Sequence, residues 1–259
     1  MNSKKTKIRL DRLLVERGLS PARERARALI MSGSVLVDEN IVDKAGTPVF
    51  SDATIRIKGE DNPYVSRGGL KIKGALEKFD IDVRDFVVLD VGVSTGGFTD
   101  CLLQEGAKKV YAVDVGYGQL AWKLRTDERV ILFERENIRY FSGEGIEDEI
   151  DLASIDVSFI SLKLVLPAVI SLIKDDTIIL ALIKPQFEAG KGDVGKKGVV
   201  RDPEVHTRVV EDMVTFSEGL GLEVKGTCES PLRGPAGNRE FFLYATMKPR
   251  ENKIGTGAT

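Results

Sequence analysis

Several residue types that carry common protein chemistry are scarce in this chain. Its 259 residues include two cysteines and one histidine, too few for a four-ligand zinc site or a disulfide framework. We therefore expect no metal ion and a reducing compartment. We interpret Cys101 and Cys228 as core residues and His206, at an expected helix start, as a surface or capping residue. Aromatic residues make up 7% of the sequence, which argues against a broad platform for stacking bases.

Long apolar runs are also absent. No segment approaches the roughly 20 consecutive apolar residues that cross a membrane. The first residues, Met1–Lys5, lead into charged residues rather than into the apolar core of a signal peptide. With 42% apolar and 30% charged residues, the composition is typical of a globular protein. We expect a cytoplasmic protein with no membrane partner.

The net charge of −2 hides a division of charge along the chain. Residues 1–73 contain 15 Lys or Arg and 9 Asp or Glu, a net charge of +6, so residues 74–259 carry −8. A basic segment joined to an acidic one suggests that the first part binds a polyanion, with nucleic acid as the first candidate. A basic helix pair that only keeps a small domain in solution is the alternative.

The first fifty residues predict two helices followed by a small sheet. One helix is expected between Ile8 and Gly18, and a second from Ser20, as its N-cap, and Pro21 to Gly33. Short apolar runs between turns predict strands at residues 35–37, 41–42 and 44–49. The second helix leaves arginines on its polar face at Arg23, Arg25 and Arg27.

The order of these residues resembles the RNA-binding domain named after small-subunit ribosomal protein S-four. The resemblance rests on Arg9-Leu10-Asp11, Gly18-Leu19-Ser20, Ala22-Arg23, Leu29-Ile30 and Gly33-Ser34-Val35. It implies binding of structured RNA through the helix pair. The turn Asp38-Glu39-Asn40 departs from the family, which often has Asn-Gly there, and places two acids near the expected RNA face. The basic positions that match the family's phosphate contacts are Arg9, Arg12, Arg23 and Arg27.

The rest of the chain opens with a predicted β-α-β unit. Asp85–Val91 is an apolar run of strand length, Gly92–Thr99 is a glycine-rich turn leading into a helix, and Lys109–Asp114 is a second strand. Helical patterns separate most of the later segments. The pattern predicts a doubly wound, mostly parallel α/β sheet. Further buried strands are expected at residues 130–133, 152–155, 177–183 and 241–245.

The glycine-rich turn and Asp114 indicate a nucleoside ligand. An acid at the end of the second strand is placed to bond ribose hydroxyls. Ser94 stands where a dinucleotide-binding turn needs glycine for the pyrophosphate, so S-adenosylmethionine, which has no phosphates, fits better. A tight structural turn is the alternative. The candidate cofactor-binding residues are Asp90, Gly92, Ser94, Thr95, Gly96, Gly97, Phe98, Thr99, Asp114 and Asn137.

Two charged residues directly follow later strands of the predicted sheet. Asp156 comes after the strand at 152–155, and Lys184 comes after the strand at 177–183. Ligands in such sheets bind beyond the carboxyl ends of the strands. A charged residue after a strand is usually only the start of a loop. Two of them beside one cofactor cleft favour a reaction site.

Longer motifs extend the resemblance to nearly the whole chain. They are Ser66–Lys71, Asp90–Asp100, Asp114–Leu120, Asp156–Ser161 and Lys184–Glu188. With them the chain resembles the TlyA family, known both as hemolysin A and as ribosomal RNA methyltransferase. That family joins the RNA-binding domain to an FtsJ-like domain of the Rossmann-like class I methyltransferase fold. The resemblance implies methylation of cytidine 2′-hydroxyls of ribosomal RNA, in one or both ribosomal subunits, with S-adenosylmethionine as cofactor.

Related 2′-O-methyltransferases carry a Lys-Asp-Lys-Glu tetrad, and its motif matches in this chain are Lys71, Asp156, Lys184 and Glu240. Methyl transfer to oxygen needs alignment of the 2′-oxygen and removal of its proton. We expect Lys184 to act as the base or the oxygen-orienting group. Asp156 and Glu240 would hold the lysines, and Lys71 would orient the ribose or influence Lys184.

The expected organisation is an RNA-binding domain at 1–58, a linker at 59–69, a methyltransferase domain at 70–250 and a tail at 251–259. A long glycine-rich stretch after Lys184 predicts a surface loop, which either has no role or closes on RNA. The remaining candidate RNA-binding residues, from the linker and this loop, are Arg67, Lys191, Lys196 and Lys197.

Three other functions are open but less favoured. The intact tetrad argues against a ribosome-assembly factor that only binds RNA. A pore-forming hemolysin needs an apolar span, a signal peptide or a strongly amphipathic apolar helix, and the sequence shows none. A pseudouridine synthase has no use for a glycine-rich turn paired with Asp114. The sequence does not indicate which nucleotide is modified, or an oligomeric state.

Overall fold

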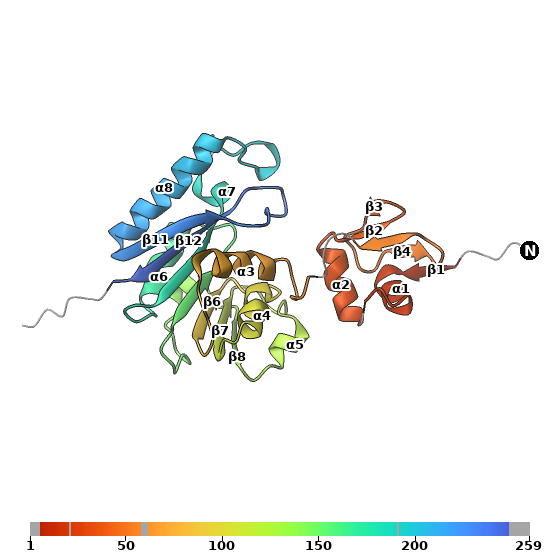
Figure 1. Ribbon diagram of the computed structural model, residues 1–259, viewed down its shortest axis with the longest axis horizontal. Coiled ribbons are helices and arrows are strands. Elements are labelled where there is room, and N and C mark those ends of the chain that lie inside the picture. The colour runs from red at the N-terminus through yellow and green to blue at the C-terminus, as the bar shows by residue number, and fades with distance from the viewer. Residues whose placement is uncertain (1–5, 21, 58–61, 191, 249–259) are drawn as a thin grey trace, which may run out of the picture. The chain divides into compact units, whose positions relative to one another are not determined.

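The computed structural model describes residues 6–20, 22–57, 62–190 and 192–248. Contacts divide the chain into two compact units, Met1–Arg67 and Gly68–Thr259, which run from red to orange and from orange to blue in Figure 1. Residues 59–61 of the expected linker and the expected tail at 251–259 lie outside the described residues.

The described part of the first unit contains two helices and several short strands. The two predicted helices and the strands after them are present, but a further strand, β1, precedes the first helix. Apolar side chains of both helices form one core with the strands, including Leu10, Leu14, Ala26, Ile30 and Val35. Strand β1 pairs with β4, and β2 pairs with β3 and β5, all antiparallel. The elements are β1 (Lys7–Arg9), α1 (Leu10–Glu16), α2 (Arg23–Met31), β2 (Val35–Val37), β3 (Asn40–Ile41), β4 (Pro48–Phe50) and β5 (Ile55–Ile57).

Some local predictions for this unit are wrong. Ile8 lies in β1 rather than in a helix, because that segment pairs with β4. Ser20 does not cap α2: its hydroxyl donates to the carbonyl oxygen of Ala22 at 3.0 Å, and Ala22 is the N-cap residue. Strand β5 has no counterpart among the predicted elements. Pro21 lies outside the described residues.

The second unit alternates strands and helices. Helix α3 begins at Gly68, two residues before the expected start of the second domain. The helices are α3 (Gly68–Phe79), α4 (Gly97–Gln104), α5 (Trp122–Arg125), η1 (Ile138–Tyr140), α6 (Leu162–Ile170), α7 (Pro185–Glu188), η2 (Lys196–Gly198) and α8 (Pro203–Gly219). The strands are β6 (Val87–Val91), β7 (Lys109–Asp114), β8 (Val130–Glu134), β9 (Leu152–Ile155), β10 (Ile178–Ile183), β11 (Leu222–Glu229) and β12 (Phe241–Met247).

These strands form one sheet in the order β11-β12-β10-β9-β6-β7-β8. The five strands from β10 to β8 in that order are parallel, whereas β12 runs antiparallel to both β10 and β11. The predicted doubly wound, mostly parallel sheet is confirmed. Strand β11 has no counterpart among the predictions, because buried and exposed residues alternate along this edge strand and it contains no continuous apolar run.

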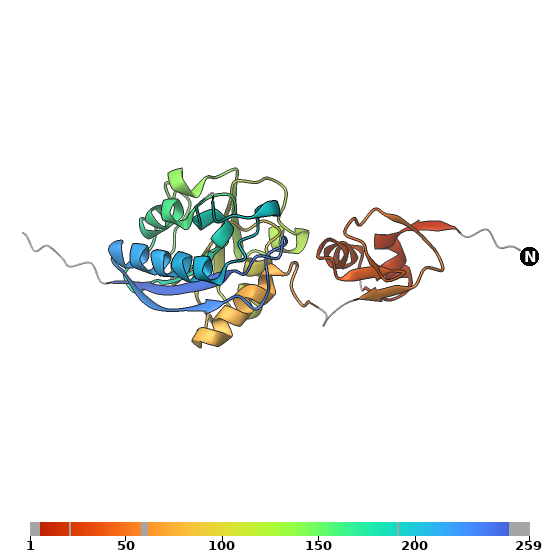
Figure 2. The same cartoon turned by 90° about the horizontal axis from the view of Figure 1, so that it is seen from above.

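Successive strand residues face two different layers of helices (Figure 2). Leu89 and Ile155 belong to the apolar core that α6 and α8 cover. Their neighbours Asp90 and Ser154 point to the other face, where Asp90 meets Thr99 of α4. In Figure 2 the orange helix α3 and the blue helix α8 lie on opposite sides of the blue strands. This layering leaves the carboxyl ends of the parallel strands at one edge of the unit.

The single histidine is buried and Asp202 is the N-cap of its helix, so the prediction of a surface or capping residue is wrong. His206 lies in the first turn of α8 and is 4% exposed. Its Nε2 lies 3.1 Å from the Val200 carbonyl oxygen, and its ring centroid lies 5.9 Å from that of Phe241. Cys101 is buried, as expected of a core residue, and Cys228 is half-buried.

Candidate active site

The strand register brings the sequence motifs to one edge of the sheet. Val91, the last residue of β6, is level with Val113 of β7 and with Ile155 of β9. On the other side of β9, the final β10 residue, Ile183, pairs with Phe241 of β12. The glycine-rich turn, Asp114 and all but Lys71 of the tetrad therefore border the same edge, as expected for a doubly wound sheet.

Two glycines of the turn have structural reasons to be glycine. Gly92 has φ +85°, and a Cβ there would lie 2.5 Å from the Asp156 carbonyl oxygen. Gly96, the N-cap of α4, has φ +93°, and a Cβ would lie 2.3 Å from Leu124 Cδ1. Both positions combine a left-handed backbone with a close neighbour. The turn is thereby held against the loop that carries Asp156.

Asp114 is oriented by the backbone of two loops. One carboxylate oxygen accepts a hydrogen bond from the Ser94 N–H at 2.7 Å, and the other accepts one from the Gly116 N–H at 2.6 Å. Ser94 is exposed and has φ +51°. A carboxylate has about four acceptor positions, so Asp114 retains capacity for the two hydroxyls of a ribose.

Asp90 lies beneath the turn rather than at its surface. It is 1% exposed, and its two oxygens accept hydrogen bonds from Thr99 Oγ1 at 2.6 Å and Ser154 Oγ at 2.8 Å. Burial raises the pKa of the Asp90 carboxyl to about 6, against the lowering effect of these hydrogen bonds. Asp90 and Thr99 therefore brace the turn against β9.

The other candidate cofactor residues lie in and beside the turn. Gly97 begins α4, and Phe98 is buried with its ring 6.1 Å from that of Phe242. The Thr95 carbonyl oxygen accepts a hydrogen bond from Ala121 N–H at 3.2 Å. Asn137 is the N-cap of η1, and its side chain accepts from the backbone of Arg139. Of these, Phe98 is packed into the protein core.

The first half of the tetrad is a buried ion pair. Lys71 Nζ lies 2.5 Å from Glu240 Oε2, and the two side chains are 10% and 1% exposed. Helix α3, which carries Lys71, packs on the loop before Glu240: a Cβ on Gly74 would lie 2.7 Å from Pro231. In the same loop, a Cβ on Gly234 would lie 2.4 Å from Glu240 Oε1. The small residues thus set the position of this pair.

The second half of the tetrad is a separate ion pair. Lys184 Nζ lies 2.5 Å from Asp156 Oδ1 and donates a hydrogen bond to Ser158 Oγ at 2.9 Å. The Lys184 side chain is 9% exposed and that of Asp156 is 22% exposed. Each lysine of the tetrad therefore faces its own carboxylate, and the second pair is the more open to a ligand.

A further hydrogen bond set ties together the motifs that carry Asp156 and Lys184. Glu188 accepts from the Ser161 hydroxyl at 2.6 Å and from the Leu162 N–H at 2.8 Å. In the same motif, Phe159 has φ +64° and is 92% exposed, with its ring 5.2 Å from that of Phe187. An exposed aromatic ring therefore directly follows Ser158, the hydrogen-bond partner of Lys184.

Sequence reasoning missed several residues that hold this site. Ser154, within β9, bonds Asp90, and Ser158, in the motif after β9, bonds Lys184. Asn238, which is 2% exposed, bonds the Val200 N–H and the Gly198 carbonyl oxygen, each at 2.9 Å. It thus joins the glycine-rich loop to the segment that carries Glu240. Its place two residues before Glu240 was the one available indication.

Several candidate RNA-binding residues are engaged within the protein. Arg9 and Arg23 both bond Asp11, and Arg12 bonds Glu16 at 2.6 Å. The turn at 38–40 uses its acids internally, since Asp38 accepts from the Thr54 N–H and Glu39 pairs with Arg56. Lys191 lies outside the described residues. The exposed candidates in the described residues include Arg27, Arg67, Lys196 and Lys197.

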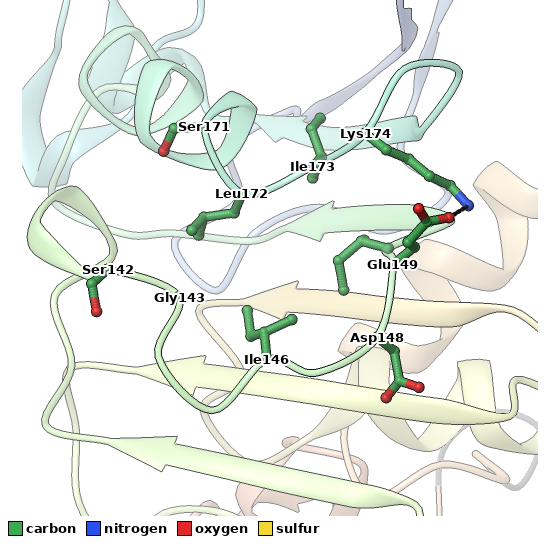
Figure 3. A pocket seen from close by; sticks show the side chains of 10 residues that line it. Ser142, Gly143, Ile146, Asp148, Glu149, Ser171, Leu172, Ile173 and Lys174 are labelled. Carbon is green, nitrogen blue, oxygen red and sulfur yellow. Dashed lines mark hydrogen bonds and ion pairs between the residues drawn. The ribbon is translucent and has the colours of Figure 1, made fainter.

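A shallow pocket lies at the other end of the strands (Figure 3). It is lined by six residues between positions 142 and 150, which precede β9, and by residues 171–174, which precede β10. Lys174 reaches across to Glu149 at 3.0 Å and to Asp151 at 3.2 Å. The pocket is therefore separate from the edge that carries the tetrad.

The described residues include no helix that is both long and apolar enough to cross a membrane. They also include no group of three or more His, Cys, Asp or Glu side chains that could hold a metal ion.

Comparison with protein families assigns both units. The model of the FtsJ-like methyltransferase family matches residues 64–247. The model of the S4 domain, the domain expected from the first fifty residues, matches residues 8–55. The first of these matches covers more than half of the chain.

Individual proteins are similar over almost the full length. YqxC of Bacillus subtilis, named as an rRNA methyltransferase, is 52% identical over 245 residues, which span 94% of this chain and 86% of the relative. The 16S/23S rRNA (cytidine-2′-O)-methyltransferase TlyA of Mycobacterium tuberculosis is 47% identical over 92% of this chain and 89% of its own.

A solved structure gives the same result. A protein named as a hemolysin from Streptococcus thermophilus is 43% identical, with a TM-score of 0.75 over 97% of this chain and 93% of its own. Taken with the geometry above, these similarities show that the chain belongs to the FtsJ-like methyltransferase family and, within it, to the group that contains TlyA.

Proposed function

We propose that this protein methylates cytidine 2′-hydroxyls of ribosomal RNA with S-adenosylmethionine. The observation that carries the proposal is the Lys184–Asp156 ion pair at the sheet edge that also holds the glycine-rich turn and Asp114. The relative from Mycobacterium tuberculosis, which is 47% identical to this chain, is named as an enzyme with that activity. Such a substrate places the enzyme in the cytoplasm.

The edge of the sheet suits the proposed cofactor. Asp114 offers oriented acceptors for a ribose diol, and the exposed turn at Ser94 lacks the glycine that a pyrophosphate would need. When bound, S-adenosylmethionine supplies a methyl group that is already electrophilic. Residues of the turn, Gly92–Thr99, would hold its amino-acid part, with Asn137 beside its base.

The two ion pairs have different roles in the proposed reaction. Lys184 acts as the base for the proton of the 2′-hydroxyl or as the group that orients its oxygen, with that oxygen held in line with the methyl group. Asp156 and Ser158, both in contact with Nζ, fix its direction. The buried Lys71–Glu240 pair orients the ribose. Phe159, which is exposed and follows Ser158 in the chain, offers a ring to the displaced base.

RNA would be held through two sets of basic residues. In the domain at residues 1–58, arginines on the helix pair would contact phosphates, which position RNA without reading its sequence. In the catalytic domain at residues 70–250, the exposed Lys196 and Lys197 would do so from the glycine-rich loop, with Lys191 and the linker residue Arg67. The excess of acid over base in residues 74–259 makes the first domain the main source of RNA affinity.

The test uses the full chain, methyl-labelled S-adenosylmethionine and separated small and large ribosomal subunits. We expect label in ribosomal RNA at a cytidine whose 3′ phosphodiester bond resists alkaline hydrolysis, the mark of a 2′-O-methyl group. Lys184→Ala should lower the rate at least about 100-fold and leave cofactor affinity unchanged. Label on a base, or full methylation by Lys184→Ala, would contradict the proposal.

A further inference from the structure

A buried carboxylate connects two arginines of the first unit. Asp11 is 0% exposed although it belongs to the first turn of α1. Its Oδ2 accepts hydrogen bonds from Arg9 Nη2 and from Arg23 Nε, each at 3.0 Å, and its Oδ1 accepts from Arg9 Nε at 3.1 Å. The two arginine side chains are 53% and 59% exposed. A buried acid thus holds two exposed cations.

The residues around the Arg9 side chain leave space for this arrangement. A Cβ on Gly46 would lie 3.1 Å from Arg9 Nη1, so any larger residue would press on the guanidinium. The backbone around Gly46 is fixed to α1, because Leu10 N–H donates to the Thr47 carbonyl oxygen and Asp11 N–H to that of Ala45. The absence of a side chain at 46 leaves room for the guanidinium beside Asp11.

The charges favour a role beyond packing. Two guanidinium groups that share one carboxylate oxygen are close neighbours, and Asp11 offsets their mutual repulsion. The pKa of Asp11 is lowered to about 2, chiefly by the hydrogen bond from Arg9, so the carboxylate is ionised at neutral pH. Within the described residues Arg23 donates only through Nε, so both of its terminal nitrogens are left to donate elsewhere. Together, the two arginines and Asp11 carry one net positive charge, on guanidinium groups that are half exposed.

We propose that Asp11 is a positioning residue for RNA, which holds Arg9 and Arg23 side by side as a fork for one backbone phosphate. The inference rests on the proposed function, since it assumes that this unit binds RNA. It goes further by assigning two of the arginines to a single phosphate. It also makes an acidic residue favourable for binding a polyanion.

The direction in which one substitution changes RNA affinity distinguishes the proposed phosphate contact from a general electrostatic attraction. Asp11→Asn removes a negative charge close to the RNA, so an unstructured basic surface would bind RNA more tightly. The fork predicts the opposite: affinity for purified ribosomal subunits falls about tenfold, because the guanidiniums separate. The slope of log affinity against log salt should also fall by roughly one phosphate contact.

Asp43→Asn is the matched control. Asp43 is an exposed acid of the same unit, and its substitution changes the net charge by the same amount. It should bind the subunits as tightly as the unaltered protein or more tightly. Equal affinity of the two variants would overturn the fork, whereas failure of the unaltered protein to bind either subunit would overturn the proposed function instead.

A second variant covers the case in which Asp11→Asn does not fold. Arg23→Lys keeps the charge but loses the Nε–H group and the flat fork. It should weaken subunit binding about as much as Asp11→Asn, with circular dichroism and cofactor affinity unchanged. Combining Asp11→Asn with Arg23→Lys should add little to either loss, because both act on the same contact. Unchanged binding by Arg23→Lys, or additive losses, would contradict the proposal.

Discussion

Lys71 Nζ lies 2.5 Å from Glu240 Oε2, although 169 residues separate the two along the chain. The pair ties the first helix of the catalytic unit to the start of its final strand. Both side chains are almost fully buried, so each depends on the other for its charge compensation. The proposed catalytic arrangement and the closure of the fold therefore share one contact.

Breaking this pair from one side should destabilise the protein strongly. Lys71→Met leaves the Glu240 carboxylate buried without its cation, and we expect a loss of about 3–5 kcal/mol in the free energy of unfolding. Lys71→Met combined with Glu240→Gln removes both charges and should recover much of that loss. Urea unfolding of the two single variants and the double variant measures the coupling. Additive losses would show that the two side chains do not act as a pair.

Gly234 should be required for activity through its effect on Glu240. A Cβ at this position would lie 2.4 Å from Glu240 Oε1, so Gly234→Ala must displace the carboxylate. We expect kcat for methylation to fall at least about tenfold, while cofactor affinity is unchanged. Gly219→Ala, at the end of α8 with open space around it, should leave kcat unaffected. Similar kinetics for both variants would rule out this explanation.

Asp90 should make stability depend on pH. Burial raises its pKa to about 6, whereas an unfolded Asp titrates near about 3.9. Between these values the folded protein holds a proton that the unfolded chain has released. The stabilisation from Asp90 is therefore full below about pH 4 and is lost as the pH rises to about 6.

Asp90→Asn tests this sign directly. An amide can still accept from one of Thr99 and Ser154 and donate to the other, and it carries no buried charge. We expect the variant to melt several degrees above the unaltered protein at pH 8, with little difference at pH 4. Differential scanning calorimetry at both values gives the comparison. A stabilisation of equal size at both pH values would show that the charge of Asp90 is not its source.

Asp114 should contribute to cofactor affinity more than to folding. Its oxygens accept from the backbone of Ser94 and Gly116 in two surface loops, so Asp114→Ala should change the melting temperature only modestly. The lost bonds to the ribose hydroxyls predict an affinity for S-adenosylmethionine about 10- to 100-fold lower by calorimetric titration. Glu134 is a useful comparison, because it also ends a strand and accepts from a loop N–H, that of Gly118. Glu134→Ala should have a smaller effect on cofactor affinity.

Residues close in sequence determined much of this protein. The apolar run 85–91, the glycine-rich turn and the acid at 114 predict the first β-α-β unit from local patterns, since periodicity, turns and strand ends are properties of neighbouring residues. This unit restricts the register of the remaining strands. Asp156 and Lys184 lie together at the edge of the sheet, as their positions directly after two strands predicted. The assignment of Lys71 and Glu240 came from motif resemblance.

Only the tertiary structure decided which of these residues touch. Lys184 takes Asp156 and Ser158 as partners, and Lys71 takes Glu240, because neighbouring strands and a distant helix converge there. Asp90 reads as a ligand residue in its motif but lies under the turn, since the alternation of β6 points it to the α4 face. From the sequence, Arg9 and Arg23 could belong to a solvated basic face. In the structure, both form ion pairs with the buried Asp11. Burial and pairing depend on chain segments that meet only in the fold, so the sequence determines the chemistry present and the fold determines which groups act together.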